Sequence, residues 1–237
     1  MTEQQNPPPR GLGRRQILKA MAVFVALPMT GADCEDGLTP GGACVPISEQ
    51  PQGPYYLTDD LLRHDVTEGR PGALLNLSIQ ILDTKTCLPI KGLRADIWHC
   101  DADGLYSGFS GQGDDGQSDE RGQTYCRGSQ FTDASGVAAF TTLYPGWYPG
   151  RTTHIHLCLH HEDGRDVVTQ LYFSDATSSE VHSSGHYADR GVKDTDNGDD
   201  ALLTGDADAG TLYIWVIPEG EGYKGEIVLG LDLEVWT

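Results

Sequence analysis

The stretch Leu75-Asn76-Leu77-Ser78-Ile79-Gln80-Ile81 decides the fold class of this 237-residue chain. Apolar and polar residues alternate through its whole length. In a β-strand, alternation of this kind places every apolar side chain on the same face. The stretch therefore predicts a strand with one face in a hydrophobic core and the other face toward solvent.

Further strands are predicted on both sides of this one. Apolar and β-branched residues between turn-rich polar segments mark them at 93–100, 137–143, 154–160, 167–173, 211–217 and 226–235. No segment past residue 32 shows a convincing 3.6-residue apolar period. Seven strands separated by Gly and Asp-Gly turns predict an all-β fold, an antiparallel β-sandwich in one domain.

Two of the predicted connections are long, one from Tyr106 to Ser135 and the other from Ser174 to Gly210. Connections of this length in a compact domain usually carry function. Residues 33–53 are rich in Gly, Pro and Ser and predict an extended N-terminal arm. We therefore expect a sandwich domain over residues 33–237, with functional loops at its ends.

The first 32 residues predict a targeting segment. Arg14 and Arg15 precede a short apolar run at 20–28, and small residues follow it. Paired arginines in this position are typical of twin-arginine export, and the run is shorter than the roughly 20 apolar residues that span a bilayer. We expect a signal peptide over residues 1–32 and a protein that is periplasmic or extracellular, with no stable membrane insertion after signal removal.

The net charge and the cysteine content limit the possible partners and predict the redox state of the thiols. The net charge of −19 argues against nucleic acid as a partner. All six cysteines follow the expected signal peptide, and an even count in an oxidising compartment predicts disulfides with 15 pairings open. No Cys-x-x-Cys is present to suggest a thiolate zinc site. The cysteines are Cys34, Cys44, Cys87, Cys100, Cys126 and Cys158.

The densest chemical signal runs from Tyr144 to His156 and reads YPGWYPGRTTHIH. Residues i and i+2 of a strand face the same way, so His154 and His156 can present two imidazoles to one metal ion. The His-x-His pattern alone is ambiguous. A cupin also carries it, and in a transthyretin-like sandwich the same histidines could merely pack or line a groove.

The pattern becomes more specific beside two other segments, 98–106 (WHCDADGLY) and Gly53-Pro54-Tyr55. Together the three segments resemble the intradiol ring-cleaving dioxygenases, the family of catechol 1,2- and protocatechuate 3,4-dioxygenases. The resemblance is greatest to the exported single-chain branch of the family and extends from about Gly53 to Asp200. It implies an enzyme that cleaves catechol-type rings with O₂ to cis,cis-muconate type diacids.

The resemblance also implies the site residues and a non-haem Fe(III) cofactor. Ferric iron is a hard cation, for which anionic tyrosinate oxygens and neutral imidazoles are suitable ligands. By resemblance, the metal ligands are Tyr106, Tyr148, His154 and His156; the catalytic residues are Tyr148, Arg151 and Gln170; the substrate contacts are Tyr55, Trp98 and Pro54. The partners implied are a small aromatic diol and O₂.

The chain also departs from the family pattern. Thr152-Thr153 stands where the family often has Pro-Ala, and there is no room for the N-terminal helical dimerisation segment of the catechol dioxygenases. The oligomeric state therefore stays open. The main alternative is a non-catalytic transthyretin-like binding module, in which Trp98 is plain core and Arg151 only pairs with an acidic surface loop.

Overall fold

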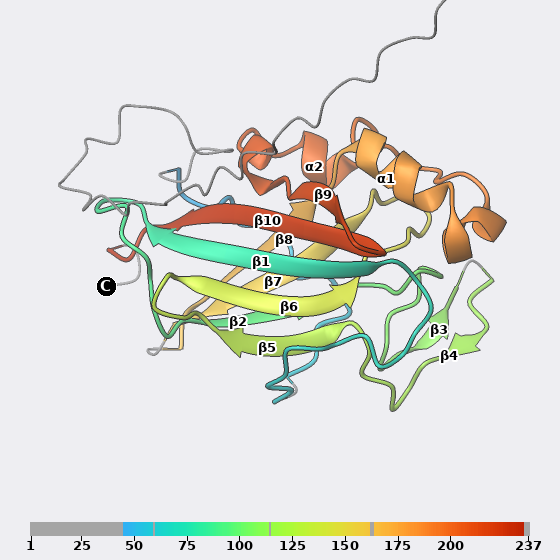
Figure 1. The fold of residues 1–237 in the computed structure, drawn as a ribbon, viewed down its shortest axis with the longest axis horizontal. Coiled ribbons are helices and arrows are strands. Elements are labelled where there is room, and N and C mark those ends of the chain that lie inside the picture. Colours follow the sequence, from blue (N-terminus) through green and yellow to red (C-terminus); the bar gives the residue numbers. More distant parts are fainter. Residues whose placement is uncertain (1–44, 59, 114, 162–163, 235–237) are drawn as a thin grey trace, which may run out of the picture. The chain divides into compact units, whose positions relative to one another are not determined.

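The computed structural model describes residues 45–58, 60–113, 115–161 and 164–234 (Figure 1). The expected signal peptide lies outside these residues, as do Cys34 and Cys44, so the predictions of export and of cysteine pairing at this end stay predictions. Within the described ranges, no helix is long and apolar enough to cross a membrane.

One four-stranded sheet carries the stretch on which the fold prediction rests. Its strand order is β6-β1-β10-β9. The alternation in β1 is confirmed, because Leu75, Leu77, Ile79 and Ile81 are each no more than 1 % exposed. Complete burial of one such side chain contributes about 1.5–3 kcal/mol. The strands are β1 (Leu74–Asp83), β6 (Val137–Leu143), β9 (Trp215–Glu219) and β10 (Gly222–Leu231).

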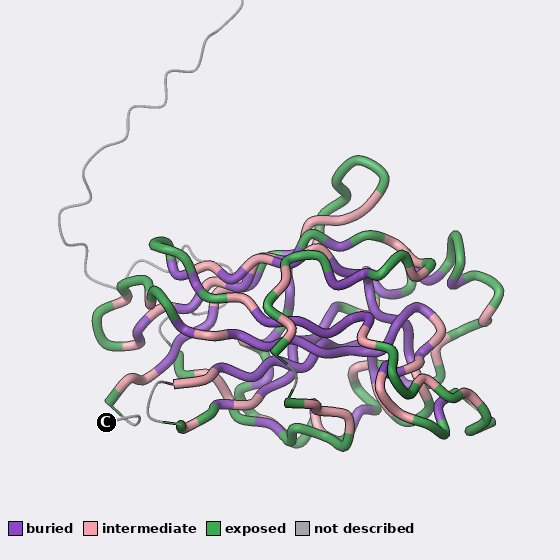
Figure 2. The backbone as a smooth tube through the Cα atoms, turned by 90° about the horizontal axis from the view of Figure 1, so that it is seen from below, coloured by how far each residue is buried: buried purple, intermediate pink, exposed green. Residues whose placement is uncertain are grey.

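The second four-stranded sheet has the order β5-β2-β7-β8 and is antiparallel throughout. In Figure 1 it lies behind the sheet of β1, β6 and β10. Figure 2 shows buried backbone mainly through the middle of the domain, with exposed segments mostly around its periphery. The predicted all-β sandwich is confirmed. The strands are β2 (Arg94–Trp98), β5 (Arg127–Phe131), β7 (His154–His160) and β8 (Asp166–Tyr172).

One strand pair departs from the prediction of an antiparallel sandwich. β1 and β10 run parallel, with Leu75 opposite Tyr223 and Ile81 opposite Leu229. The direction of β10 follows from its antiparallel hairpin with β9, which enters the sheet after the long connection beyond Ser174. Parallel neighbours need such long connections, and the apolar pattern of a single strand does not report its direction.

The two long connections contain short elements that the sequence pattern did not predict. β3 (Ser110–Gln112) and β4 (Ser118–Asp119) form a small two-stranded sheet, and β5 follows them. The second connection contains α1 (Asp175–His182), η1 (Gly185–Arg190), α2 (Ala201–Thr204) and η2 (Ala209–Leu212). The predicted strand at 211–217 is wrong at its start, because η2 covers residue 211 and β9 begins at Trp215.

The two faces of β7 serve different clusters. Ile155, Leu157 and Leu159 belong to the main core between the sheets. The side chains of alternate residues point the other way, and Cys158 there joins a smaller cluster with Trp98, Tyr106 and several partly buried aromatic rings. The predicted metal ligands of β7 lie on this second face.

Candidate metal centre and active site

Four side chains from three segments of the chain converge on one point. The Tyr106 hydroxyl lies 3.5 Å from the Tyr148 hydroxyl and 3.2 Å from His156 Nε2. His154 Nε2 lies 3.4 Å from the Tyr106 hydroxyl, 3.1 Å from the Tyr148 hydroxyl and 3.2 Å from His156 Nε2. The structure thus brings all four predicted metal ligands together.

Local structure explains how each ligand arrives. His154 and His156 are alternate residues of β7. Tyr148 lies in a tight turn in which the Arg151 N–H donates to the Tyr148 carbonyl oxygen at 3.3 Å. The turn has Pro149-Gly150 at its centre, and Gly150 has a φ of 82°, a conformation that favours glycine. This turn places Tyr148 and Arg151 next to the strand that begins at His154.

The imidazole rings of His154 and His156 are neutral, and each has one nitrogen facing the candidate metal centre. The Nδ1–H of His154 donates to the Thr152 carbonyl oxygen at 2.6 Å, which leaves the Nε2 lone pair facing the other ligands. Burial, and secondarily the charge of Arg151, lowers the pKa of His154 to about 3. Burial also holds the pKa of His156 well below its usual value. Both rings are therefore neutral, as metal ligation requires.

The two tyrosines differ in their surroundings. Tyr106 is 1 % exposed, and burial raises the pKa of its phenol well above 10. Tyr148 is half-buried, and burial raises its pKa to about 12. The charge of Arg151 lowers the pKa of both phenols less than burial raises it, so neither ionises near neutral pH without a bound metal cation. A trivalent metal would supply that cation, because coordination favours the ionised ligand.

The donor set fits a first-row metal ion. Five of the six donor-atom pairs are 3.1–3.5 Å apart, a spacing compatible with one shared ion at roughly 2 Å, the usual distance from such a metal to nitrogen or oxygen. Two phenolate oxygens and two imidazole nitrogens suit a hard or borderline cation better than a soft one. The residues present are therefore compatible with the ferric iron that the sequence analysis expected.

Arg151 and Gln170 lie together beside these ligands. Gln170 is fully buried on β8, opposite His156 of β7. Its side-chain oxygen accepts from the Arg151 guanidinium, and its amide donates to the Pro51 carbonyl oxygen at 2.9 Å. The amide of Gln170 therefore links the guanidinium to the N-terminal arm.

Asp200, which was not among the predicted site residues, holds the other side of the Arg151 guanidinium. Arg151 Nε donates to Asp200 Oδ2 at 2.8 Å, and the Asp200 side chain is 0 % exposed. The second carboxylate oxygen accepts from the Leu202 and Leu203 N–H groups at the start of α2. The acid that pairs with Arg151 is therefore buried rather than at the surface, and Arg151 also donates to Gln170; its role in catalysis stays a prediction. An Asp before Ala-Leu-Leu, a helix N-cap pattern, was the available signal.

The predicted substrate contacts occupy three different places. The Tyr55 ring stacks on the Tyr106 ring with centroids 4.4 Å apart, so it covers a metal ligand. Trp98 stacks on His156, 4.9 Å between centroids and 10° from parallel. Pro54 is exposed on the N-terminal arm. The roles of these three residues toward a substrate stay predictions.

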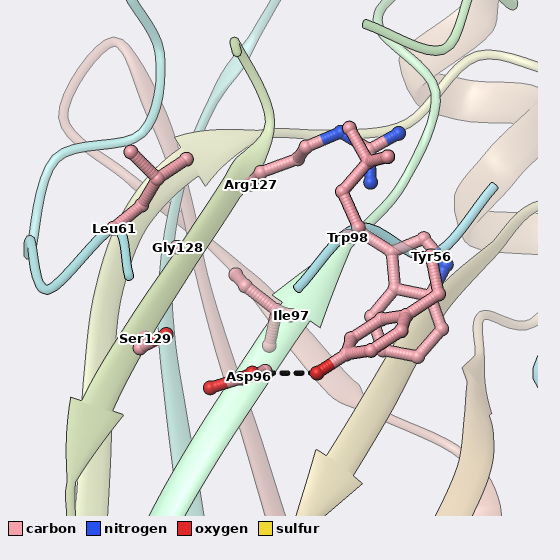
Figure 3. A pocket seen from close by; sticks show the side chains of 9 residues that line it. Tyr56, Leu61, Asp96, Ile97, Trp98, Arg127, Gly128 and Ser129 are labelled. Atoms are coloured by element: carbon pink, nitrogen blue, oxygen red, sulfur yellow. Dashed lines mark hydrogen bonds between the residues drawn. The ribbon is translucent and has the colours of Figure 1, made fainter. Parts of the chain in front are cut away.

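A small pocket lies beside Trp98 (Figure 3). Tyr56 and Trp98 line it with Arg127 and Asp96, and the Tyr56 ring lies 4.7 Å from the Trp98 ring. Trp98 therefore contacts the rings of both Tyr56 and His156. This position supports the His156 ring, whatever else Trp98 does.

Three of the cysteines do not match the prediction of disulfides. Cys100, Cys126 and Cys158 are free and buried. Burial raises the pKa of each of these thiols. The prediction is wrong for these three residues, because an even cysteine count says nothing about which thiols the fold buries apart from one another.

Other residues near the centre were also missed. Tyr172 lies on the same face of β8 as Gln170, and its hydroxyl donates to Gln50 Oε1 at 2.6 Å. Gly53, with a φ of 73°, packs tightly against His156, since a Cβ there would lie 3.3 Å from His156 Cε1, closer than ordinary van der Waals contact. The i+2 spacing from Gln170 could have indicated Tyr172. Gly53 belongs to a segment that carried the resemblance, but its contact with His156 is non-local and could not be predicted, as is true of the contact between Gln50 and Tyr172.

Fold and site together define a β-sandwich protein with a buried centre of two phenols and two imidazoles. Residues 52–184 match a family model described as dioxygenase. The chain is 31 % identical to an intradiol ring-cleavage dioxygenase from Tetranychus urticae, with a TM-score of 0.70 over 80 % of this chain and 94 % of that one. The chain belongs to the intradiol ring-cleavage dioxygenase family, whose members are oxidoreductases.

Two other relatives agree with this assignment. The dioxygenase domain of a dioxygenase carbohydrate-binding protein fusion from Streptomyces sp. SirexAA-E is 28 % identical, with a TM-score of 0.58 over 79 % of this chain and 99 % of that one. Hydroxyquinol 1,2-dioxygenase from Corynebacterium glutamicum is 28 % identical over 166 residues. That match covers 60 % of this chain and 50 % of the relative, so the chain spans about half the length of this curated protein.

Proposed function

We propose that this protein is an Fe(III)-dependent intradiol dioxygenase that cleaves catechol-type rings with O₂ to cis,cis-muconate type diacids. The observation that carries the proposal is the convergence of Tyr106, Tyr148, His154 and His156, with five of the six pairs of donor atoms 3.1–3.5 Å apart. We assign all four as iron ligands. When bound, ferric iron supplies the Lewis acidity that ionises phenols and diols and activates the diol ring toward O₂.

The two tyrosines have different roles in the proposed site. Tyr106 is buried beneath Tyr55 and serves as a permanent ligand. Tyr148 is less buried, and its hydroxyl lies 3.1 Å from His154 Nε2. We assign Tyr148 as the base that accepts a proton from the entering diol, because its basic phenolate oxygen is the more accessible of the two.

Arg151 stabilises negative charge that develops on the substrate. Its guanidinium is permanently charged and is held from two sides, by Gln170 and by the buried Asp200. A group fixed in advance loses no energy to reorganisation during the reaction, which is why such donors stabilise transition states well. Gln170 acts by orienting Arg151. We propose that the substrate contacts Tyr55, Trp98 and Pro54.

Metal content and colour test the ligand assignment. The purified protein should contain about one iron per chain and be reddish-brown, because phenolate-to-iron charge transfer absorbs visible light. Tyr148→Phe should shift or weaken this band. Tyr213→Phe is the matched control, since Tyr213 is 36 % exposed and lies outside the site. A colourless protein with full iron occupancy would rule out tyrosine ligation.

Product analysis tests the reaction. Cleavage should fall between the two hydroxyl-bearing carbons, and mass spectrometry with NMR on products from a panel of catechols would identify the diacid. A yellow semialdehyde, from cleavage beside the diol, contradicts the proposal. The binding-module alternative predicts no turnover and no iron, and membership in a family of oxidoreductases does not favour it.

Export is a separate proposal that rests on sequence alone. Residues 1–32 are proposed to be a twin-arginine signal peptide and 33–237 the mature protein, in the periplasm or outside the cell. Replacing Arg14 and Arg15 by Lys should retain the protein in the cytoplasm, which fractionation would detect. Cys87 is disulfide-bonded, and because Cys100, Cys126 and Cys158 are free, its partner is proposed to be Cys34 or Cys44.

A further inference from the structure

The face of β7 that carries the candidate iron ligands continues beyond them. His154, His156, Cys158 and His160 are alternate residues of one strand, so their side chains project on the same side, ~7 Å apart at each step. The first two belong to the centre described above. The next two meet Asp166, which lies opposite His160 on β8.

Cys158, His160 and Asp166 form a second cluster of metal-ligating atoms. His160 Nδ1 lies 2.8 Å from Asp166 Oδ1 and 3.9 Å from Cys158 Sγ. The three ligand atoms all lie within 4.8 Å of one another. Thiolate, imidazole and carboxylate are the protein ligands of Zn²⁺, at roughly 2.0–2.3 Å from the ion. Small movements of these side chains would bring all three atoms to that distance.

The remaining nitrogen of His160 has the partner that metal-bound histidines usually have. His160 Nε2 lies 2.9 Å from Asp96 Oδ2, and the Asp96 side chain is only 7 % exposed. Asp96 is itself held by Arg94 Nε at 2.8 Å and by the Tyr56 hydroxyl at 3.1 Å, the latter contact visible in Figure 3. A histidine that ligates through one nitrogen normally donates the other N–H to such a carboxylate, which fixes the ring.

The cluster is open on one side and favours a cation. Cys158 is 1 % exposed, whereas the side chains of His160 and Asp166 are 22 % and 46 % exposed. An ion can therefore enter from the Asp166 side, and water can complete its coordination. Two carboxylates, Asp166 and Asp96, supply negative charge here, and each accepts from one ring nitrogen of His160, so Nδ1 carries a proton when no metal competes for it.

We propose that Cys158, His160 and Asp166 bind a divalent cation of the Zn²⁺ class through Sγ, Nδ1 and a carboxylate oxygen. Water is the fourth ligand. Binding releases the Sγ proton and the Nδ1 proton to solvent, and no redox change occurs. The ion joins β7 to β8 next to the proposed iron centre without sharing a ligand with it.

Cobalt(II) is the probe, used on the full-length, iron-loaded protein. Co²⁺ should bind at one equivalent per chain with a thiolate-to-cobalt charge-transfer band in the near ultraviolet, and Zn²⁺ should remove that band. The candidate iron centre has no sulfur ligand and cannot produce the band. The colour of the ferric protein reports the iron centre separately, so failure of either proposal can be recognised without the other.

Cys158→Ser should abolish the thiolate band, and Asp166→Asn should weaken Co²⁺ binding at least tenfold. Asp96→Asn should weaken it by about 10- to 100-fold, the usual effect of losing a carboxylate that orients a ligating histidine. The matched control is His186→Gln. His186 also pairs with a carboxylate, Asp103, at 2.9 Å, but lies outside the cluster, and its replacement should change nothing.

Two outcomes would overturn the proposal. One is the absence of a thiolate band in the unaltered protein at a large excess of Co²⁺. The other is a band that persists in Cys158→Ser, which would place the ion on another cysteine. If Cys158→Ser does not fold, Asp166→Asn provides the test, because the Asp166 side chain is half-exposed and tolerates the change. An unchanged affinity of Asp166→Asn for Co²⁺ would then refute the site.

Discussion

Replacing Arg151 by Leu is the most informative test of the proposed mechanism. Arg151 is not an assigned ligand, yet its guanidinium connects Gln170 of β8 to Asp200 at the start of α2. The substitution removes the positive charge while leaving the four assigned ligands in place. Iron content, colour and the spectral change on adding catechol without O₂ should therefore be retained.

The expected loss of rate follows from the role of one preorganised donor. Removing such a group typically costs about 10² to 10³ in rate, or ~3 to 4 kcal/mol of transition-state stabilisation. The loss should fall on kcat and kcat/KM together, because the interaction forms mainly in the transition state. At least a hundredfold slower turnover is predicted.

The same substitution also lowers stability, and the size follows from Asp200. This carboxylate is 0 % exposed and would lose its charged partner, keeping the Thr152, Leu202 and Leu203 N–H groups. Leaving one ion of a buried pair alone costs about 3–5 kcal/mol, and the lower end applies because Arg151 is 18 % exposed. Reduced activity alone could then reflect partial unfolding.

A double variant separates the two effects. Arg151→Leu with Asp200→Asn removes the unpaired charge, so it should be more stable than Arg151→Leu in urea unfolding, while its turnover stays equally slow. Stopped-flow kinetics on folded, iron-loaded protein provides the rates. Near-normal turnover in Arg151→Leu would remove Arg151 from the mechanism. Recovery of activity in the double variant would show that the loss came from stability alone.

Two further substitutions test the surroundings of the site. Gly53→Ala should reduce iron content and turnover, because the new Cβ would lie 3.3 Å from His156 Cε1. Gly69→Ala is the control, because Gly69 has a similar positive φ but open space around it, and it should leave both unchanged. Equal effects of the two substitutions on iron content would contradict the proposed contact. The hydrogen bond to Asp96 raises the pKa of His160 to about 10, whereas a histidine in the unfolded chain has a pKa of about 6.5. In chelator-treated protein, protonated His160 should therefore stabilise the fold fully below pH ~6.5. This stabilisation should be lost as the pH rises from about 6.5 to 10. Urea unfolding of the unaltered protein and His160→Gln across that range would measure this, and a constant difference would refute it.

The strands were predictable because their signal is local. Alternation identified β1, and apolar and β-branched residues between turn-rich segments identified β6 and β7 with the right bounds. The parallel pairing of β1 with β10 joins residues almost 150 positions apart in sequence, such as Leu75 and Tyr223, and no local pattern encodes it. The helices between Ser174 and Gly210 were missed because they are only 4 to 8 residues long.

The candidate site divides in the same way. By itself the sequence determined that His154 and His156 share one face, because a strand repeats every two residues. It also supplied motifs whose resemblance selected Tyr106, Tyr148, Arg151 and Gln170. Only the tertiary structure placed these groups within contact of one another.

Partners of the site residues were decided by tertiary structure alone. Asp200 meets Arg151 across 49 positions of sequence, and Asp96 meets His160 across 64. The three free cysteines were equally beyond prediction, since pairing depends on which thiols the fold brings close. The physical reason is common to all of these: periodicity in one strand reports which face a side chain occupies, whereas the identity of the group opposite it depends on how distant segments pack.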